Sequence, residues 1–357
     1  MKNFYNNKKV LITGHTGFKG SWLTQMLINW GAKIIGVSLP PNTTPNLFDS
    51  LGLKSKLYKN YFEDIRDYNK MKEIFEHEKP EIVFHLAAQP LVRDSYDDPL
   101  TTHSSNIMGT ANILQAIKEV GGVKSAVIIT TDKVYENKEC LYPYRETDAL
   151  GGYDPYSASK AAADIVVNSY IQSFFNPKDF GLGHNTLIAI ARAGNVIGGG
   201  DWAKDRLVPN MVRAIFEYDE SVTIRNPQAV RPWQHVLEPL VGYLMLGQRL
   251  YNGDREMSGA WNFGPHEEGV VCVEELVQKG IGVLGKGSHK VIKDYSKHEA
   301  GLLKLDISKA VNILGWRPKW NFHDGLRITF EWYDQYYRDP QNIEELTNQQ
   351  IRFYLGD

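Results

Sequence analysis

The sequence predicts an α/β protein with a doubly wound parallel sheet and a smaller, mostly helical C-terminal region. Two observations support this fold class. Short apolar runs alternate with helical patterns over the first half of the 357 residues, as expected of parallel strands covered by helices on both faces. Beyond about residue 200 this alternation thins, and segments broken by Pro and Gly lead to a tail containing Trp316, Trp320 and Trp332.

Each predicted strand is a short apolar run, and helical patterns separate the runs. The predicted strands cover residues 9–13, 33–38, 82–86, 126–130 and 187–191. A helix is expected over 22–30, because Leu23, Met26, Leu27 and Trp30 share one of its faces.

The same alternation predicts two regions in the chain. One domain is expected over residues 1–190, with a segment near 228–258 returning to it. The second region, over 191–357, is expected to close over the sheet.

Composition argues against several classes of protein. Hydrophobic residues make up 42% of the chain and charged residues 23%, which is typical of soluble globular proteins. A net charge of −2 does not favour nucleic-acid binding. Two cysteines are too few for a disulfide scaffold, and the ten histidines lack metal-ligand spacing, so no metal is expected. The polar N-terminus and the lack of a long apolar run predict a cytoplasmic protein without a membrane span.

A glycine-rich loop follows the first predicted strand directly. Gly14, Gly17 and Gly20 form the pattern G-x-x-G-x-x-G, and a helix follows them. Such glycines permit a tight turn, and the N-terminus of the next helix offers N–H groups to a pyrophosphate. The position of the loop therefore predicts a Rossmann-type dinucleotide site, with cofactor contacts at Gly14, Thr16, Gly17, Phe18 and Gly20.

The second predicted strand lacks the acidic residue that usually binds the adenosine ribose. The first carboxylate after this strand is Asp49, so Ser38 or Asn42 would have to supply neutral hydrogen bonds. No arginine stands there to bind a 2′-phosphate. NAD is favoured, NADP is not excluded, and weak cofactor binding is predicted.

Further cofactor contacts are expected after two later strands. Asp64 and Ile65 are candidates for the adenine, although a solvated turn explains them nearly as well. The small residues of Leu86-Ala87-Ala88 suit a backbone that lies close to a cofactor.

Tyr156 and Lys160 are the main candidates for chemistry. Their four-residue spacing places both side chains on one face of a helix, one turn apart. An ammonium group beside a phenol favours the phenolate, which can take a proton from an alcohol while a nicotinamide takes the hydride. The hydroxyl of Thr131 is expected to bridge to the same substrate oxygen.

In their order and spacing, these residues resemble the extended short-chain dehydrogenase/reductase family. The resemblance covers nearly the whole chain and implies a nucleotide-sugar substrate, bound between the sheet and the C-terminal region. The motifs that carry it are the glycine loop, His85-Leu86-Ala87-Ala88, Thr131, Tyr156 with Lys160, Arg192-x-x-Asn195-Val196, Arg231-Pro232-Trp233-Gln234-His235-Val236, Asn262-Phe263-Gly264 and Leu314-Gly315-Trp316-x-Pro318.

Finer motifs resemble the sugar 4,6-dehydratases, and most closely those that act on CDP-D-glucose. They are Thr131-Asp132-Lys133, Gly198-Gly199-Gly200-Asp201-Trp202 and Arg231-Pro232-Trp233-Gln234-His235. The resemblance implies NAD-dependent conversion of CDP-D-glucose to CDP-4-dehydro-6-deoxy-D-glucose and water. The cytosine base follows from the resemblance alone, and another nucleotide sugar remains an alternative.

Such a reaction oxidises carbon 4, eliminates water across carbons 5 and 6, and reduces carbon 6. Asp132 is the candidate acid, because burial can keep a carboxyl group protonated. Lys133 stands where the family usually has a glutamate base. It acts either as a neutral, desolvated base or as a cation that stabilises an enolate. An exposed ion pair between the two residues is the plain structural alternative.

Four residues are candidates for contact with the substrate: Arg192, Asn195, Arg206 and Arg231. The planar guanidinium group suits phosphate, and the resemblance places Arg231 at the pyrophosphate. Arg192 is equally well explained by a structural ion pair. For Asn195, a turn cap is the less favoured alternative. His235 is expected to pack within the fold.

Two other functions remain open at this stage. A sugar-nucleotide 4-epimerase needs Thr131, Tyr156 and Lys160 but no elimination pair. A sensor that binds NAD(P) without catalysis is free to lose the tyrosine or the lysine. The resemblance also implies a homodimer or a dimer of dimers, paired through helices at 101–120 and 156–175.

Overall fold

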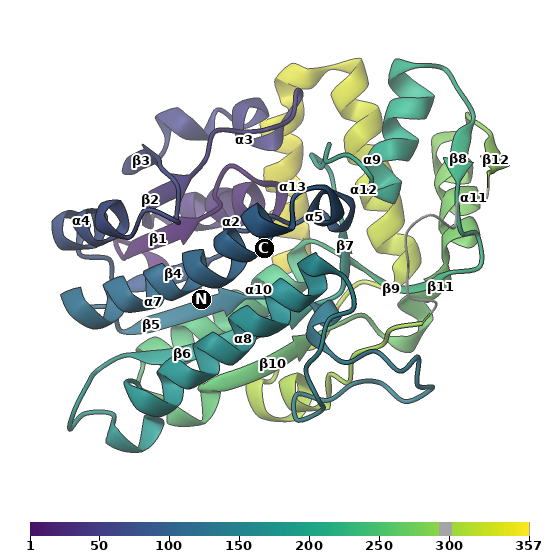
Figure 1. Cartoon of the computed structure of the whole chain (residues 1–357). Coiled ribbons are helices and arrows are strands. Elements are labelled where there is room, and N and C mark those ends of the chain that lie inside the picture. The colour runs from purple at the N-terminus through teal and green to yellow at the C-terminus, as the bar shows by residue number, and fades with distance from the viewer. Residues whose placement is uncertain (293–301, 357) are drawn as a thin grey trace.

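Seven parallel strands form the central sheet of the computed structural model, which describes residues 1–292 and 302–356 (Figure 1). Their order across the sheet is β10-β6-β5-β4-β1-β2-β3. The strands are β1 (Lys9–Thr13), β2 (Lys33–Ser38), β3 (Lys59–Phe62), β4 (Ile82–His85), β5 (Ser125–Ile129), β6 (Leu187–Ala193) and β10 (Gly259–Phe263). The predicted doubly wound fold is therefore confirmed.

The strand order reverses at β1. From β1 the chain builds β2 and β3 on one side, and then returns to place β4 on the other. Thr13, at the end of β1, consequently pairs with both Val37 of β2 and His85 of β4. A crevice forms outside the carboxyl ends of parallel strands at such a switch point, and ligands bind there in open α/β sheets.

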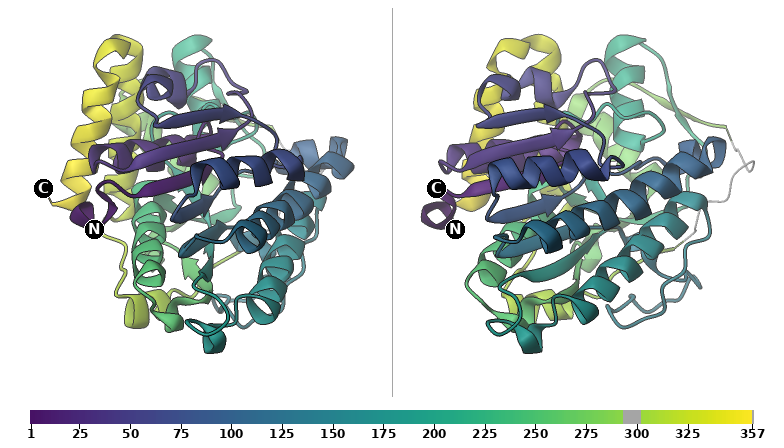
Figure 2. Two further views of the ribbon diagram at one scale, coloured as in Figure 1. Left: turned by 90° about the vertical axis from the view of Figure 1, so that its left-hand side faces the viewer. Right: turned by 60° about the vertical axis from the view of Figure 1, so that its left-hand side comes forward.

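Side chains of each strand alternate between the two faces of the sheet, and each face has its own apolar core. Leu11 and Ile35 pack in one core, against α4 (Tyr68–Glu78), α7 (Gly109–Val120) and α8 (Pro155–Ser173). Val10 and Ile12 pack in the other core, against α2 (Phe18–Asn29) and α10 (Leu237–Tyr251). Figure 1 shows α4, α7 and α8 in front of the sheet, and Figure 2 shows the layers from the side.

Shorter helical elements connect the layers. They include α1 (Lys2–Tyr5), α3 (Leu47–Ser50), α5 (Val92–Asp97), α6 (Pro99–His103) and the short 3₁₀ helix η3 (Asp132–Val134). A π-helical segment over Ser104–Met108 joins α6 to α7, so that residues 99–120 are helical throughout.

The C-terminal region combines helices with two small sheets. One sheet holds β7 (Asn195–Ile197), β9 (Val230–His235) and β11 (Val270–Cys272), and the other pairs β8 (Val222–Ile224) with β12 (His289–Val291). The helices are α9 (Leu207–Val212), α11 (Val273–Leu284), α12 (Phe322–Arg338) and α13 (Ile343–Leu355).

Several predicted boundaries differ from the observed elements. The segment 228–258, predicted to return to the first domain, contains α10, and β10 follows it and pairs with β6 at the sheet edge. The domain bounds stay predictions. Helix α2 begins at Phe18 rather than at 22, since the glycine loop itself leads into its first turn. Strand β6 runs past the predicted boundary at 190 and ends at Ala193.

The Trp-rich tail packs close to α2 at Gly199. A Cβ atom on Gly199 would lie 2.0 Å from the ring of Trp332 in α12. On the other side, the indole N–H of Trp22 donates to the Gly199 carbonyl at 2.9 Å. Because Gly199 has no side chain, the backbone at this residue can contact Trp22 of α2 and Trp332 of α12 at the same time.

Candidate active site

A cavity of about 1100 Å³ lies between the sheet and the C-terminal region. Its walls come from the residues after β5, the start of α8, the residues after β6 and the loop before α9. Charged and polar residues that line it include Lys19, Thr131, Asp132, Lys133, Tyr156, Asn195, Arg206 and Arg231. The structure therefore brings together the predicted catalytic turn, the tyrosine and three of the four predicted substrate contacts.

The glycine loop lies against the end of β4. Gly14 has a φ of +74°, and a Cβ atom there would lie 2.7 Å from the Ala87 nitrogen. The Thr13 hydroxyl accepts hydrogen bonds from the Leu86 and Ala87 nitrogens, each at 3.1 Å. Gly20 is packed equally closely, because its Cβ would lie 2.0 Å from the Gly14 carbonyl oxygen. These contacts hold the loop and the end of β4 together at the switch point.

The N-terminus of α2 suits an anion. Gly17 stands at its N-cap position with an exposed backbone, and no side chain caps the helix. The first turn contains no acidic residue and instead carries Lys19. Free N–H groups, the positive helix end and a lysine attract a phosphate group. The residues present therefore fit the pyrophosphate of a dinucleotide.

Neutral groups occupy the place where an acid would meet the ribose. The Thr16 hydroxyl lies 2.8 Å from the Ser38 hydroxyl and donates to the Leu39 carbonyl at 2.9 Å. Asp64 is turned toward Arg66, with 2.6 Å between its Oδ2 and Nη2. Ile65 is buried against Gly109 of α7, so its side chain serves packing. The predicted adenine contacts at Asp64 and Ile65 stay predictions.

The turn after β5 places Thr131 and Asp132 at the cavity wall. The Thr131 hydroxyl donates to Asp132 Oδ1 at 2.9 Å. Asp132 is 3% exposed, and its Oδ2 is buried without a hydrogen-bond partner among the described atoms. Burial raises the pKa of Asp132, while Lys133 and the Thr131 hydroxyl oppose the shift. The carboxyl group is thus suited to hold a proton, as a general acid requires.

Helix α8 begins so that Tyr156 stands in its first turn. Asp154 caps the helix by accepting from the Ser157 nitrogen at 2.9 Å, and Pro155 fills the first position. Lys160, one turn later, is buried, and its Nζ donates to the Ile129 carbonyl at 2.9 Å. The helix therefore presents Tyr156 to the cavity and directs Lys160 to the end of β5.

The acid strengths of this pair differ from the sequence prediction. Burial raises the pKa of Tyr156 to about 12, and the Thr131 hydroxyl opposes the shift. Burial lowers the pKa of Lys160 to about 8, against the attraction of Asp164. The prediction that Lys160 lowers the pKa of Tyr156 is not met in the protein alone, since Lys160 binds a carbonyl and burial dominates.

The predicted substrate residues fall into two groups. Arg206, Arg231 and Asn195 line the cavity. Arg206 Nη1 is held by Asp201 Oδ2 at 2.8 Å, and Arg231 Nη1 donates to the Val230 carbonyl at 2.9 Å. The two guanidinium groups from separate elements suit a phosphate-bearing ligand.

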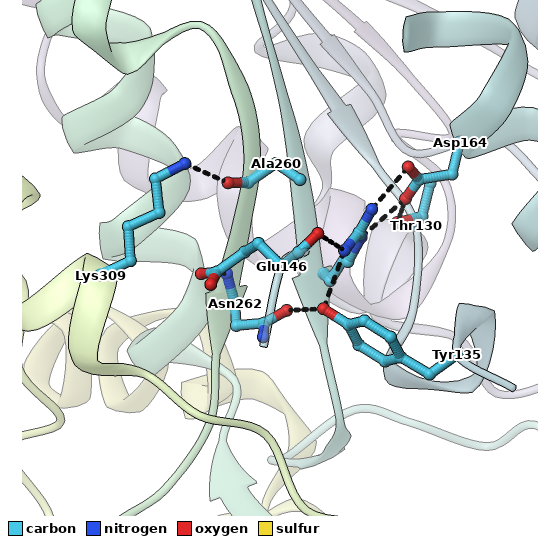
Figure 3. Close-up of polar contacts among 8 residues, drawn as sticks. Thr130, Tyr135, Glu146, Asp164, Ala260, Asn262 and Lys309 are labelled. Carbon is cyan, nitrogen blue, oxygen red and sulfur yellow. Dashed lines mark hydrogen bonds and ion pairs between the residues drawn. The ribbon is translucent and has the colours of Figure 1, made fainter. Parts of the chain in front are cut away.

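Arg192 is a correction to the predicted substrate contacts. It is 3% exposed, and its guanidinium binds both oxygens of Asp164, each at 2.8 Å. Its Nη1 donates to the Tyr135 hydroxyl at 2.8 Å (Figure 3). Because all these partners lie within the fold and Arg192 does not line the cavity, its role is structural.

Sequence reasoning missed Lys19. Its charge acts on Asp132, whose pKa it lowers, and burial together with Arg206 lowers the pKa of Lys19 to about 8. The signal was available, because a lysine in the first turn of a helix opposes the helix dipole. His235 packs as predicted, with its ring 4.9 Å from that of Trp320 and 5.8 Å from that of Trp22.

Residues 1–292 and 302–356 contain no group of three or more His, Cys, Asp or Glu side chains that could hold a metal ion. Within the same residues, no helix is long and apolar enough to cross a membrane.

Residues 11–329 match the GDP-mannose 4,6 dehydratase family. A CDP-glucose 4,6-dehydratase of Salmonella typhimurium strain LT2 is 47% identical over 338 residues, which are 94% of this chain and 93% of that protein. A UDP-glucuronate 4-epimerase of Thermodesulfobacterium geofontis is 25% identical over 349 residues, covering 94% of this chain and 97% of that protein.

Solved structures share the fold. A dTDP-glucose 4,6-dehydratase from Streptomyces venezuelae, with NAD and TYD bound, superposes with a TM-score of 0.77 and 23% identity. The match covers 95% of this chain and 99% of the dehydratase chain. A UDP-glucose 4-epimerase from Thermotoga maritima has a TM-score of 0.75 at 23% identity. The match covers 92% of this chain and 99% of the epimerase chain. Dehydratases and epimerases thus share this fold, so the fold alone does not distinguish the two activities.

Proposed function

Because this chain belongs to the GDP-mannose 4,6-dehydratase family of extended short-chain dehydrogenases/reductases, we propose that it is an NAD-dependent CDP-D-glucose 4,6-dehydratase. The product is CDP-4-dehydro-6-deoxy-D-glucose, with the loss of one water. The relative at 47% identity over 94% of the chain supports the substrate. The single structural observation that carries the reaction concerns Asp132, at the wall of the cavity that Tyr156 also lines: its Oδ2 is buried and has no hydrogen-bond partner among the described residues.

The first step removes hydrogen from carbon 4 of the glucose. Tyr156 takes the proton of the hydroxyl group as phenolate, which requires the positive charge of bound NAD to lower the pKa of the tyrosine below its value in the protein alone. Thr131 orients the substrate oxygen by a hydrogen bond. Bound NAD supplies a hydride acceptor at this stage and a hydride donor at the last one. Lys160 supports the nicotinamide ribose. The free N–H groups of α2 and Lys19 hold the pyrophosphate.

The second step eliminates water. The new ketone acidifies the hydrogen on carbon 5, and a base removes it as a proton. Asp132 donates its proton to the departing hydroxyl on carbon 6, so that water leaves and a double bond forms between carbons 5 and 6. A hydride then adds to carbon 6 and a proton to carbon 5, which restores the cofactor. The net change is the loss of water.

Lys133 has two chemically distinct roles open to it. As a neutral amine it removes the proton from carbon 5, and as an ammonium it stabilises the enolate. Lys133→Arg separates them, because arginine keeps the positive charge but does not act as a base near neutral pH. Retention of about a tenth or more of the turnover supports the cationic role, given that a general base contributes about 10²–10⁴-fold. Exchange of the carbon 5 hydrogen with D₂O, followed by NMR, reports the same step directly.

A 4-epimerase is the main alternative, since relatives of that class share the fold. An epimerase needs no acid beside the bridging threonine, whereas here Asp132 accepts the Thr131 hydrogen bond and stays buried. A non-catalytic NAD(P) sensor is disfavoured because Thr131, Tyr156 and Lys160 are all retained around the cavity wall and the end of β5.

One panel of substrates tests the proposal. The purified protein is incubated with NAD and with CDP-, dTDP-, UDP- or GDP-glucose in turn, and the ultraviolet band of a 4-keto-6-deoxy sugar is read in base. We expect the band with CDP-glucose. A band with another nucleotide only would change the substrate, a C4-epimer by NMR would favour the epimerase, and no product with any sugar would contradict the enzyme.

We further propose that two copies pair through the face formed by α7 and α8, which run side by side in front of the sheet (Figure 1). Apolar side chains stay exposed along these helices: Ile165 in α8 is 56% exposed, and Met108, directly before α7, is 55% exposed. Ala161 and Ala163, by contrast, are buried within the subunit. The small-residue run therefore serves packing inside one copy, while the larger apolar side chains face outward.

A further inference from the structure

Tyr156, Lys160 and Asp164 follow one another at four-residue intervals along α8, so they lie along one face of that helix. Asp164 is 1% exposed and takes both hydrogen bonds of the Arg192 fork, at 2.8 Å and 2.8 Å. We propose that Asp164, held by Arg192, is a positioning residue for the active site. It fixes Lys160 and Thr131 relative to each other through the ends of β5 and β6.

The first part of the argument is the attachment of α8 to β5. Lys160 donates to the carbonyl of Ile129, the last residue of β5. Thr130, the next residue, donates from its hydroxyl to Asp164 Oδ2 at 3.3 Å. Two successive turns of the helix therefore bind two successive residues of the chain, and Thr131 follows directly. A shift of α8 would move Tyr156 away from the Thr131 hydroxyl, with which it interacts.

The second part is the attachment to β6. Arg192 is the last residue but one of β6, which lies beside β5. The Thr130 nitrogen donates to the Ala191 carbonyl at 2.9 Å, so the two strand ends remain joined beyond the ladder. The Arg192 guanidinium then joins the ends of β5 and β6 to Asp164 of α8. Because it makes two hydrogen bonds to one carboxylate, it fixes the orientation of α8 as well as its distance from the strands.

A third set of bonds joins the pair to the C-terminal region (Figure 3). The Tyr135 hydroxyl receives a bond from Arg192 and donates to Asn262 Oδ1 at 2.7 Å. The Asn262 amide donates to the Tyr144 and Asp306 carbonyls, at 2.9 Å and 3.2 Å. The turn with Asp132, the edge strand β10 and the segment after residue 302 thus converge on Arg192.

Stability alone does not account for such a pair. Replacing a buried ion pair with apolar residues often leaves stability unchanged or improved, because desolvation offsets the attraction between the charges. What apolar packing does not supply is a fixed direction between a helix and two strand ends. An active site whose residues come from α8 and the ends of β5 and β6 requires this fixed direction.

Asp164 also acts on Lys160 through its charge. The groups that interact with the Lys160 ammonium are Asp164 on the same helix, Lys19 on α2 and His85 at the end of β4. Asp164 is the acid among them, and it raises the pKa of Lys160 against burial. Loss of that carboxylate should therefore make Lys160 release its proton at a lower pH.

The test compares Asp164→Asn with the parent enzyme, and its kinetic part rests on the proposed function. NAD affinity is measured against pH by tryptophan fluorescence, and kcat and KM are measured with CDP-glucose. We expect the pH at which NAD binding weakens to fall by about one unit. We also expect kcat to fall roughly tenfold to hundredfold, with KM within about twofold, as for a small misplacement of reacting groups. If NAD affinity depends on pH in the same way in the variant and the parent, the proposal is overturned.

A second variant separates positioning from folding. Asp164→Asn/Arg192→Gln removes the unpaired buried charge, and we expect its thermal midpoint to recover while the pH shift and the loss of kcat remain. If the double variant regains the parent values, or if neither variant folds, the pair serves folding only and the proposal fails. The matched control is Asp254→Asn, because Asp254 forms a more exposed ion pair with Arg249 at 2.7 Å. This variant should change neither the pH dependence of NAD affinity nor kcat.

The two proposals fail in different ways. A parent protein that converts no nucleotide sugar contradicts the proposed function, yet its NAD binding still reports the effect of Asp164. A parent that is active, with an Asp164→Asn variant indistinguishable from it, contradicts the positioning role alone.

Discussion

Asp132 has two carboxylate oxygens in different surroundings. Oδ1 accepts a hydrogen bond from Thr131, whereas Oδ2 is buried without a partner among the described atoms. A charged carboxylate in that place would lack half of its hydrogen bonds, and this is why burial raises its pKa. The protonated form carries no charge and is therefore favoured at this buried position.

Asp132→Asn should separate oxidation from elimination. The amide keeps the shape of the carboxyl group but has no proton of suitable acidity to give. We expect turnover to fall by about 10²–10⁴-fold, while a single turnover still reduces bound NAD, seen as NADH absorbance. NAD affinity should stay within about twofold. Turnover near the parent level would show that another group protonates the leaving hydroxyl.

Tyr156→Phe removes only the phenolic oxygen. Because that oxygen is the proposed acceptor of the carbon 4 proton, oxidation itself should stop, and no NADH should form in a single turnover. Turnover should fall by at least about 10²-fold. The fold and NAD binding should remain, as followed by circular dichroism and fluorescence titration. An active Tyr156→Phe protein would contradict the assignment.

At the scale of elements, α8 depends on the loop that leads into it. A Cβ atom on Gly152 would lie 2.1 Å from the Ala158 nitrogen and from the Ser157 carbonyl carbon. Both are backbone atoms of the first turn, so neither can rotate away. The loop therefore packs on the turn that carries Tyr156 only because residue 152 has no side chain.

Gly152→Ala should displace the first turn of α8. We expect a loss of about 1–3 kcal/mol in the free energy of unfolding, as for overpacking, and a lower kcat, because Tyr156 moves with the turn. Gly282→Ala is the matched control. Gly282 lies within α11 with nothing within 4 Å of its Cβ position, so alanine should stabilise the helix by about 1 kcal/mol. Urea unfolding and steady-state kinetics measure both effects.

At the scale of the whole molecule, the exposed apolar face of α7 and α8 predicts the assembly. Ile165→Asp places a charge in the middle of that face and should convert a dimer to a monomer in light scattering. Leu182→Asp is the control, since Leu182 is 89% exposed but lies outside both helices. A parent that is monomeric, or an Ile165→Asp variant that stays dimeric, would contradict this interface.

Local pattern was sufficient for much of the fold. The bounds of β1 and β2 were predicted to the residue, and those of β4, β5 and β6 to within two residues at each end. Apolar runs report burial on both faces of a sheet, and this signal is contained in a few neighbouring residues. Strand β10 was not predicted, because its pairing with β6 joins segments far apart in the chain and does not show in the residues of either strand alone.

The sequence by itself determined the parts of the site that are local. The glycine loop requires bare backbone at fixed positions, and Tyr156 with Lys160 requires one helical turn between them. Both conditions are visible in a short run of residues. The family resemblance added the order of these motifs along the chain.

The tertiary structure decided which groups meet across the chain. It paired Arg192 with Asp164 rather than with a ligand, and it placed Lys19 near Asp132 and Arg206. It also set the direction of each pKa shift, because burial depends on segments distant in sequence that cover a residue. Helical spacing brings Tyr156 and Lys160 together, whereas only the folded sheet and its helices determine what surrounds them.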